Sequence, residues 1–83
     1  PVAAPVITLA NRTRVEGTCS VPGRIEVFSD PGDQAEIYLG EAACDAISPW
    51  QLTTTLPGGR NVTATLTDES LRTSTLSAPV AVP

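Results

Sequence analysis

Residues 50–66 read Trp50-Gln51-Leu52-Thr53-Thr54-Thr55-Leu56, then Pro57-Gly58-Gly59-Arg60, then Asn61-Val62-Thr63-Ala64-Thr65-Leu66, and this stretch decides the fold class. Apolar and hydroxyl-bearing residues alternate on both sides of the Pro-Gly-Gly segment, which is typical of two half-buried β-strands separated by a turn. We therefore expect the two runs to be the interior pair of an antiparallel sandwich. The residues expected to face inward are Trp50, Leu52, Thr54, Leu56, Val62, Ala64 and Leu66, and those expected to face water are Thr53, Thr55, Thr63 and Thr65.

Short strand-like segments separated by turns continue along the rest of the chain. We expect further strands over residues 6–9, 14–19, 24–29, 35–39, 41–46 and 73–82, with Pro79 restricting the last one to a sheet edge or a bulge. The other residues expected to point inward are Val15, Gly17, Cys19, Ile25, Val27, Ile37, Leu39, Ala42, Cys44 and Ala46, whereas Phe28 and Tyr38 fall on the opposite face. No segment has a convincing helical period, so no helix longer than one turn is expected. Seven or eight short strands with turns about every 8 to 12 residues predict an all-β sandwich.

The chain has two cysteines, Cys19 and Cys44, and is small enough to need a covalent link. Its 83 residues make one domain near the lower limit of what a single core can hold together. An even cysteine count in a small, loop-rich chain favours a disulfide and an oxidising, extracellular location, and the two cysteines fall at the same phase of two predicted strands. Two buried free thiols in a reducing compartment are the alternative.

Charge and residue content argue against several classes of function. The chain has five arginines, no lysine, no histidine and nine carboxylates, for a net charge of −4, which argues against a nucleic-acid partner. A general base or nucleophile would have to be a carboxylate, a tyrosine or a cysteine, so we expect neither an enzyme nor a cofactor. No apolar run approaches the roughly 20 residues that cross a bilayer, so no membrane insertion is expected.

Strings rich in alanine, valine and proline occupy both ends of the chain. Such strings are typical of connectors between domains. We therefore expect residues 1–5 to be a linker, residues 6–82 to be one domain, and the partners to include neighbouring domains of the same polypeptide.

The order of these strands and turns resembles that of a known family. The segments that carry the resemblance are Val15-Glu16-Gly17-Thr18, Pro22-Gly23, Ile25-Glu26-Val27-Phe28-Ser29-Asp30, Tyr38-Leu39-Gly40, Asp45, Trp50, Leu56-Pro57-Gly58-Gly59, Asn61-Val62-Thr63-Ala64-Thr65-Leu66-Thr67-Asp68 and Thr73-Ser74. They are similar to the bacterial Ig-like modules, which recur, often in tandem, in large secreted and surface-attached proteins. Over about residues 7–82 the resemblance implies an Ig-like, Greek-key sandwich of about seven antiparallel strands in two sheets, in an extracellular or cell-surface protein.

Two features depart from that family. Such modules usually have a Gly-Asn pair after the final aspartate, where this chain has Glu69-Ser70-Leu71-Arg72, so the turn there must be remodelled. The two cysteines stand where the family more often has small residues, which suggests a disulfide added to an ordinary member.

The function that the resemblance implies is that of a non-catalytic structural spacer or adhesion unit. One alternative is a carbohydrate-binding accessory module of a secreted hydrolase, because Glu26, Phe28 and Tyr38 could form a patch with aromatic rings able to stack on a sugar or dock a host or matrix protein. Another is a calcium-rigidified linker, for which Asp30, Asp33 and Asp68 are weak candidates in oxygen-rich turns. No set of six oxygens occurs at a fixed spacing, so we expect no metal.

Overall fold

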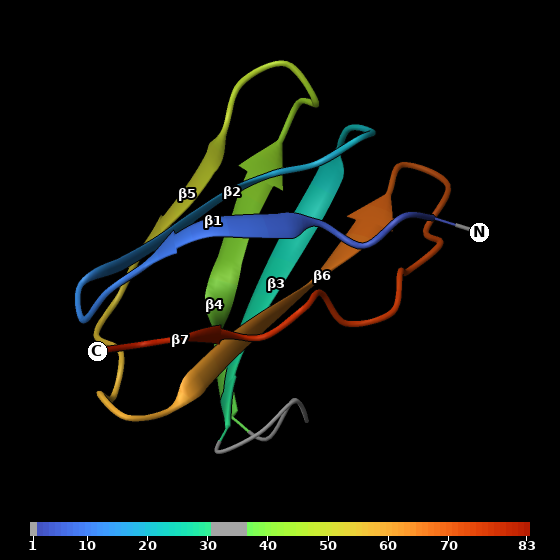
Figure 1. Ribbon diagram of the computed structural model, residues 1–83. Coiled ribbons are helices and arrows are strands. Elements are labelled where there is room, and N and C mark those ends of the chain that lie inside the picture. Colours follow the sequence, from blue (N-terminus) through green and yellow to red (C-terminus); the bar gives the residue numbers. More distant parts are fainter. Residues whose placement is uncertain (1, 31–36) are drawn as a thin grey trace.

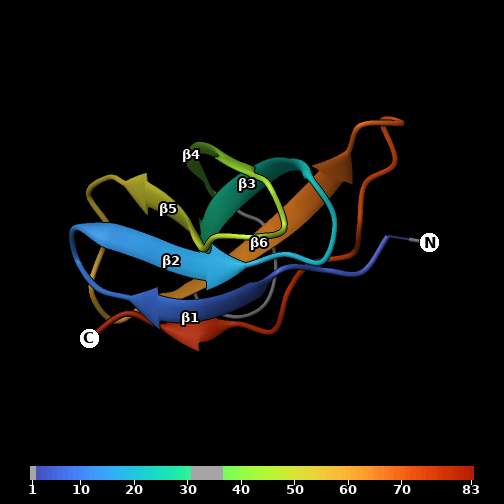
Figure 2. The ribbon, with the colours of Figure 1, turned by 90° about the horizontal axis from the view of Figure 1, so that it is seen from above.

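Two antiparallel sheets make up the computed structural model, which describes residues 2–30 and 37–83. One sheet has the strand order β1-β2-β5 and the other has the order β4-β3-β6-β7. The strands are β1 (Val6–Ala10), β2 (Arg14–Thr18), β3 (Gly23–Asp30), β4 (Ile37–Cys44), β5 (Trp50–Thr53), β6 (Asn61–Asp68) and β7 (Val80–Ala81). The smaller sheet lies across the larger one (Figures 1 and 2). Seven strands and no helix among the described residues confirm the all-β, two-sheet prediction.

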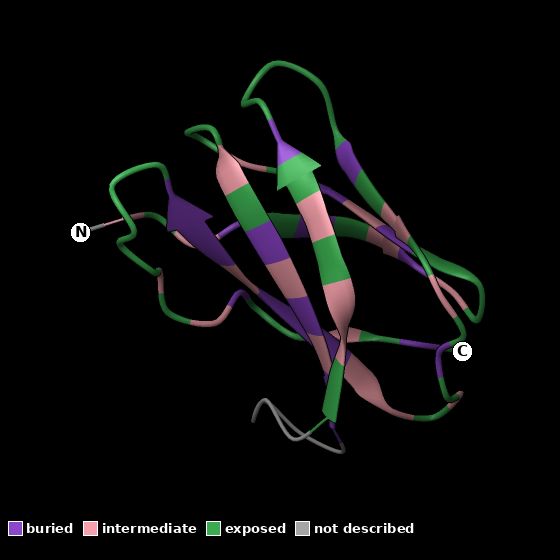
Figure 3. Ribbon diagram, turned by 180° about the vertical axis from the view of Figure 1, so that it is seen from behind, coloured by how far each residue is buried: buried purple, intermediate pink, exposed green. Residues whose placement is uncertain are grey.

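The core lies between the two sheets, and both contribute to it. Buried side chains alternate with more exposed ones along β3, as expected for a strand with one face inward (Figure 3). The buried apolar set is Ile7, Ala10, Val15, Ile25, Val27, Cys44, Trp50, Leu56, Val62, Ala64, Leu66 and Val82. Most of the inward-facing residues predicted from alternation are in this set, and Leu39, Ala42 and Leu52 pack against it while half-buried.

The prediction that the two runs of residues 50–66 form a pair is wrong. β5 is an edge strand that pairs with β2, whereas β6 lies between β3 and β7 in the other sheet. The amide of Leu56 donates to the Arg12 carbonyl at 3.0 Å, so the chain after β5 continues along the first sheet before it crosses over. Residues 54–60 therefore make a crossover between sheets and not a tight hairpin.

Thr63 is fully buried, although we expected it in water. It lies on the outer face of β6, opposite Phe28 of β3. β6 has a neighbouring strand on each side, so a short side chain on its outer face has little access to water.

The predicted strands over 35–39 and 41–46 also need correction. Within the described residues they are one strand, β4, interrupted by a bulge in which Val27 pairs with Gly40 and Phe28 pairs with Tyr38. Gly40 has φ 151°, which a side chain would disfavour. Ile37, the first residue of β4, pairs with Ser29 and is 42% exposed, although we expected it to be buried. Ala46 lies beyond β4, in an exposed loop, and not on the inner face.

The last predicted strand, over 73–82, is mostly replaced by side-chain hydrogen bonds. Only Val80–Ala81 forms a regular strand, and Thr73 makes an isolated bridge to Thr67. Between them, the Ser74 hydroxyl accepts the Leu66 amide and the Ser77 hydroxyl accepts the Ala64 amide, each at 2.9 Å. The two serine hydroxyls thus satisfy buried donors of β6 that a continuous strand would otherwise pair.

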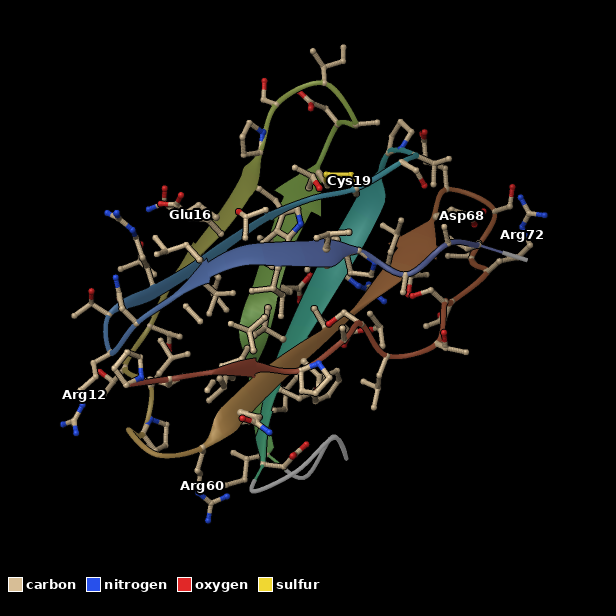
Figure 4. The ribbon with its side chains drawn as sticks, in the orientation of Figure 1. Arg12, Glu16, Cys19, Arg60, Asp68 and Arg72 are labelled. Carbon is tan, nitrogen blue, oxygen red and sulfur yellow. A yellow bond between two sulfur atoms is a disulfide. The ribbon has the colours of Figure 1, made fainter. Side chains whose placement is uncertain are left out.

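The disulfide between Cys19 and Cys44 is confirmed. Cys19 follows β2 in one sheet, and Cys44 ends β4 in the other, with their Cα atoms 6.6 Å apart. The bond therefore ties the two sheets together at one end of the sandwich (Figure 4).

Candidate functional site

The outer face of β3 and β4 brings Glu26, Phe28 and Tyr38 together, and we call these three residues the aromatic patch. Phe28 and Tyr38 are cross-strand partners, and their ring centroids lie 5.7 Å apart in an edge-on arrangement. Tyr38 is 52% exposed, while Phe28 is half-buried. Because the bulge at Gly40 shifts the register, Tyr38 lies opposite Phe28 on this face.

Charged residues continue the aromatic patch along the same face. Glu26 lies directly opposite Glu41 of β4, and the Arg24 guanidinium is within 3.7 Å of Glu26 and 3.8 Å of Glu41. Partial desolvation, followed by the charges of Glu41 and Glu26, raises the pKa of Tyr38 above its usual value. The phenol therefore stays neutral near pH 7 and can both donate and accept a hydrogen bond.

The combination of groups on this face is chemically suited to binding a ligand. An exposed ring beside carboxylates can stack on an apolar face of a ligand while the carboxylates accept its hydroxyl groups. Sequence alternation placed Glu26, Phe28 and Tyr38 on one face, but it did not single out Arg24 and Glu41, whose approach depends on the strand register.

Two of the three calcium candidates, Asp30 and Asp68, do not meet at a common site. Asp30 pairs with Asn61 at the start of β6, and Asp68 ends that same strand, so they lie at opposite ends of the larger sheet. Asp33 lies outside the described residues. Among residues 2–30 and 37–83, no group of three or more histidine, cysteine, aspartate or glutamate side chains could hold a metal ion.

Asp68 instead holds the loop between β6 and β7. One carboxylate oxygen accepts the amides of Ser70 and Arg72 at 3.0 and 2.9 Å, and the other contacts the Arg72 guanidinium at 2.9 Å (Figure 4). The Arg72 amide, with its guanidinium, lowers the pKa of Asp68. This carboxylate therefore fixes the turn made by Glu69-Ser70-Leu71-Arg72.

Asp45 plays the same part in the loop between β4 and β5. Its carboxylate accepts the amides of Ile47 and Ser48 at 2.9 and 2.8 Å, and these bonds lower the pKa of Asp45. A shallow pocket of about 220 Å³ lies beside this loop and is lined by Ala43, Cys44, Asp45, Ser48 and Pro49. We assigned no role to Asp45 from the sequence, although aspartate side chains commonly form turns by accepting a backbone amide two residues on.

No protein-family model matches the chain, and a search of curated proteins finds no match to it. The described residues include no helix long and apolar enough to cross a membrane.

Proposed function

We propose that the chain is an Ig-like, Greek-key module of a bacterial extracellular or cell-surface protein, where it serves as a non-catalytic structural spacer or adhesion unit. The strand orders β1-β2-β5 and β4-β3-β6-β7 are compatible with such a module. The bond between Cys19 and Cys44 is consistent with an oxidising compartment. Neighbouring domains of the same polypeptide are the partners that this proposal requires.

The observation that carries the proposal is the position of the two chain ends. The N-terminal and C-terminal segments leave at opposite ends of the molecule (Figure 1). β1 pairs antiparallel with β2, and β7 pairs antiparallel with β6, so a pull on both ends loads these strands along their length. Such a pull shears several backbone hydrogen bonds together, whereas a pull across a sheet breaks them one after another.

Single-molecule stretching tests this role. We expect the chain to unfold at higher force when pulled by its two ends than when pulled between the N-terminus and a click-chemistry handle at exposed Glu69, near the same end of the molecule. Reduction of the disulfide should lengthen the unfolding step by roughly 80 Å, because the cysteines are 25 residues apart and each freed residue adds about 3.3 to 3.6 Å. Equal forces in the two directions would contradict the spacer role.

The aromatic patch supports a second candidate function, a carbohydrate-binding accessory module of a secreted hydrolase. If this function holds, an array of glycans should show binding that Tyr38→Ala abolishes, because removal of the half-exposed ring removes the stacking surface. Thr53→Ala, an exposed change on β5 of the other sheet, is the matched control and should leave binding unchanged. Absence of binding across a broad panel would remove this candidate.

A further inference from the structure

Two carboxylates, Glu26 and Glu41, face each other on the outer side of the larger sheet, and we call them the acidic pair. They are partners in the register of β3 and β4, and the rings of Phe28 and Tyr38 are partners one row away (Figure 3). Side chains two residues apart on one face of a strand are separated by about 7 Å. A single sugar ring with its substituents can therefore contact both the rings and the acidic pair.

The protein neutralises the acidic pair only in part. Like charges directly opposite each other on neighbouring strands destabilise a sheet. Among the described residues, the one cation that forms an ion pair with either carboxylate is Arg24, at 3.7 Å from Glu26 and 3.8 Å from Glu41. Both distances are longer than a good hydrogen bond. Two negative charges and one shared positive charge leave the group with a net charge of −1, so this face can accommodate a further cation.

The acidic pair is accessible to a ligand, and its charge extends to the neighbouring ring. The side chain of Glu41 is 57% exposed and that of Glu26 is 29% exposed. After partial desolvation, the charges of Glu41 and Glu26 raise the pKa of Tyr38, and Arg24 lowers it by less. The face of an aromatic ring also attracts cations. A positive charge placed between Tyr38 and the acidic pair is therefore stabilised from both sides.

Neither a metal ion nor an extended peptide matches this face well. Calcium takes six to eight oxygen ligands, and the described residues offer no group of three or more metal-ligating side chains. An extended peptide binds along an exposed sheet edge through backbone hydrogen bonds, whereas β3 is paired with β4 on one side and with β6 on the other. A ligand that lies over β3 is bound through side chains, by stacking and by charge.

We propose that the aromatic patch and Glu41 bind a glycan whose sugars carry free, protonated amino groups, such as a polymer of glucosamine. The apolar face of one sugar stacks on the half-exposed Tyr38 ring, and its ammonium group lies between the two carboxylates of the acidic pair. This inference rests on the second candidate function, carbohydrate binding, and names the class of sugar. A neutral sugar would leave the charge of the acidic pair unmatched.

Three β-linked oligomers of equal length, built from glucosamine, glucose and N-acetylglucosamine, provide the test. They differ at one ring substituent, which is an ammonium, a hydroxyl or an acetylated amine. In titration calorimetry at low salt, we expect the glucosamine oligomer to bind roughly tenfold tighter than the glucose oligomer, through two exposed ion pairs. The acetylated oligomer should lack this advantage because it has no charge. Added salt should reduce the ratio of the first two affinities, because it screens exposed charges.

Variants of the acidic pair and of Arg24 should change that ratio in opposite directions. Glu41→Gln should lower it several-fold, and the double variant Glu26→Gln/Glu41→Gln should bring it near one, because an amide keeps an acceptor oxygen but loses the charge. Arg24→Gln should raise the ratio, because it removes the cation that competes with the ligand. Glu16→Gln is the matched control. Glu16 is also paired with an arginine, Arg14 at 2.8 Å, but lies on the other sheet, so the ratio should stay unchanged.

The possible failures of this inference and of carbohydrate binding are distinguishable. Equal affinities for the three oligomers, all lost in Tyr38→Ala, would overturn the inference and leave carbohydrate binding in place. A ratio that persists in the double variant would also overturn it. A lysine oligomer bound as tightly as the glucosamine oligomer, with binding retained in Tyr38→Ala, would show that this face attracts any cation and assign no sugar to it. Absence of binding to every oligomer would remove both the inference and the second candidate function.

Discussion

Alanine at position 17 is expected to destabilise the protein by about 3 kcal/mol, near the upper end of the usual cost of overpacking a core. Gly17 of β2 pairs with Trp50 of β5, and a Cβ atom there would lie 2.5 Å from the Trp50 ring and would also contact the Val6 carbonyl oxygen. The indole is buried, and its Nε1 donates to the Thr18 carbonyl at 3.2 Å, so it has little freedom to move away. Urea unfolding followed by the fluorescence of Trp50, the single tryptophan, measures the change.

Gly58→Ala is the matched control for this prediction. The nearest atoms to a Cβ atom at Gly58 belong to the side chain of Arg12, which is exposed and can move. We expect a change in the free energy of unfolding of less than about 1 kcal/mol, because the loss of backbone freedom in the unfolded chain partly offsets the crowding. Equal effects at positions 17 and 58 would show that Trp50 does not need the space that Gly17 leaves.

Removal of the disulfide is expected to cost about 3 to 4 kcal/mol in the chain-entropy model. The bond closes a loop between cysteines 25 residues apart and joins the two sheets. In the double variant Cys19→Ala/Cys44→Ala, the unfolded chain gains the freedom that the bond removes. The urea midpoint should therefore fall and the denaturant slope should rise, because a more expanded unfolded state exposes more surface.

A reducing agent separates this effect from the loss of the two cysteine side chains, of which Cys44 is buried and Cys19 is half-buried. It should lower the unfolding midpoint of the unaltered protein to about that of the double variant and should leave the double variant unchanged. A midpoint that is insensitive to reduction in both proteins would show that the bond does not stabilise the fold.

The fold class could be predicted from short-range patterns, and strand pairing could not. The alternation in residues 61–66 correctly placed Val62, Ala64 and Leu66 inside, because side chains of a strand alternate whatever the strand pairs with. The same pattern could not show that β5 and β6 belong to different sheets. That outcome depends on backbone bonds such as the one from Leu56 to Arg12, between residues far apart in the sequence.

For the candidate site, too, the sequence predicted the face on which residues lie but not the pairing between strands. Alternation alone placed Glu26, Phe28 and Tyr38 on one face, and the structure brings them together there. It could not reveal that Glu41 lies opposite Glu26 and near Arg24, because that approach depends on the register between β3 and β4. Ile47 and Leu71 lie between the strands that the sequence predicted, and only the structure shows how far their side chains are exposed.

The sequence by itself determined the all-β class, the inward residues of the regular strands and the availability of two cysteines for a bond. These properties follow from the alternation of side chains along an extended backbone and from residue content. Only the tertiary structure decided which strands share a sheet, where the bulge at Gly40 reverses the pattern, and how serine hydroxyls replace most of the last strand. These features depend on which distant backbone groups satisfy each other's hydrogen bonds, and local alternation carries no information about that choice.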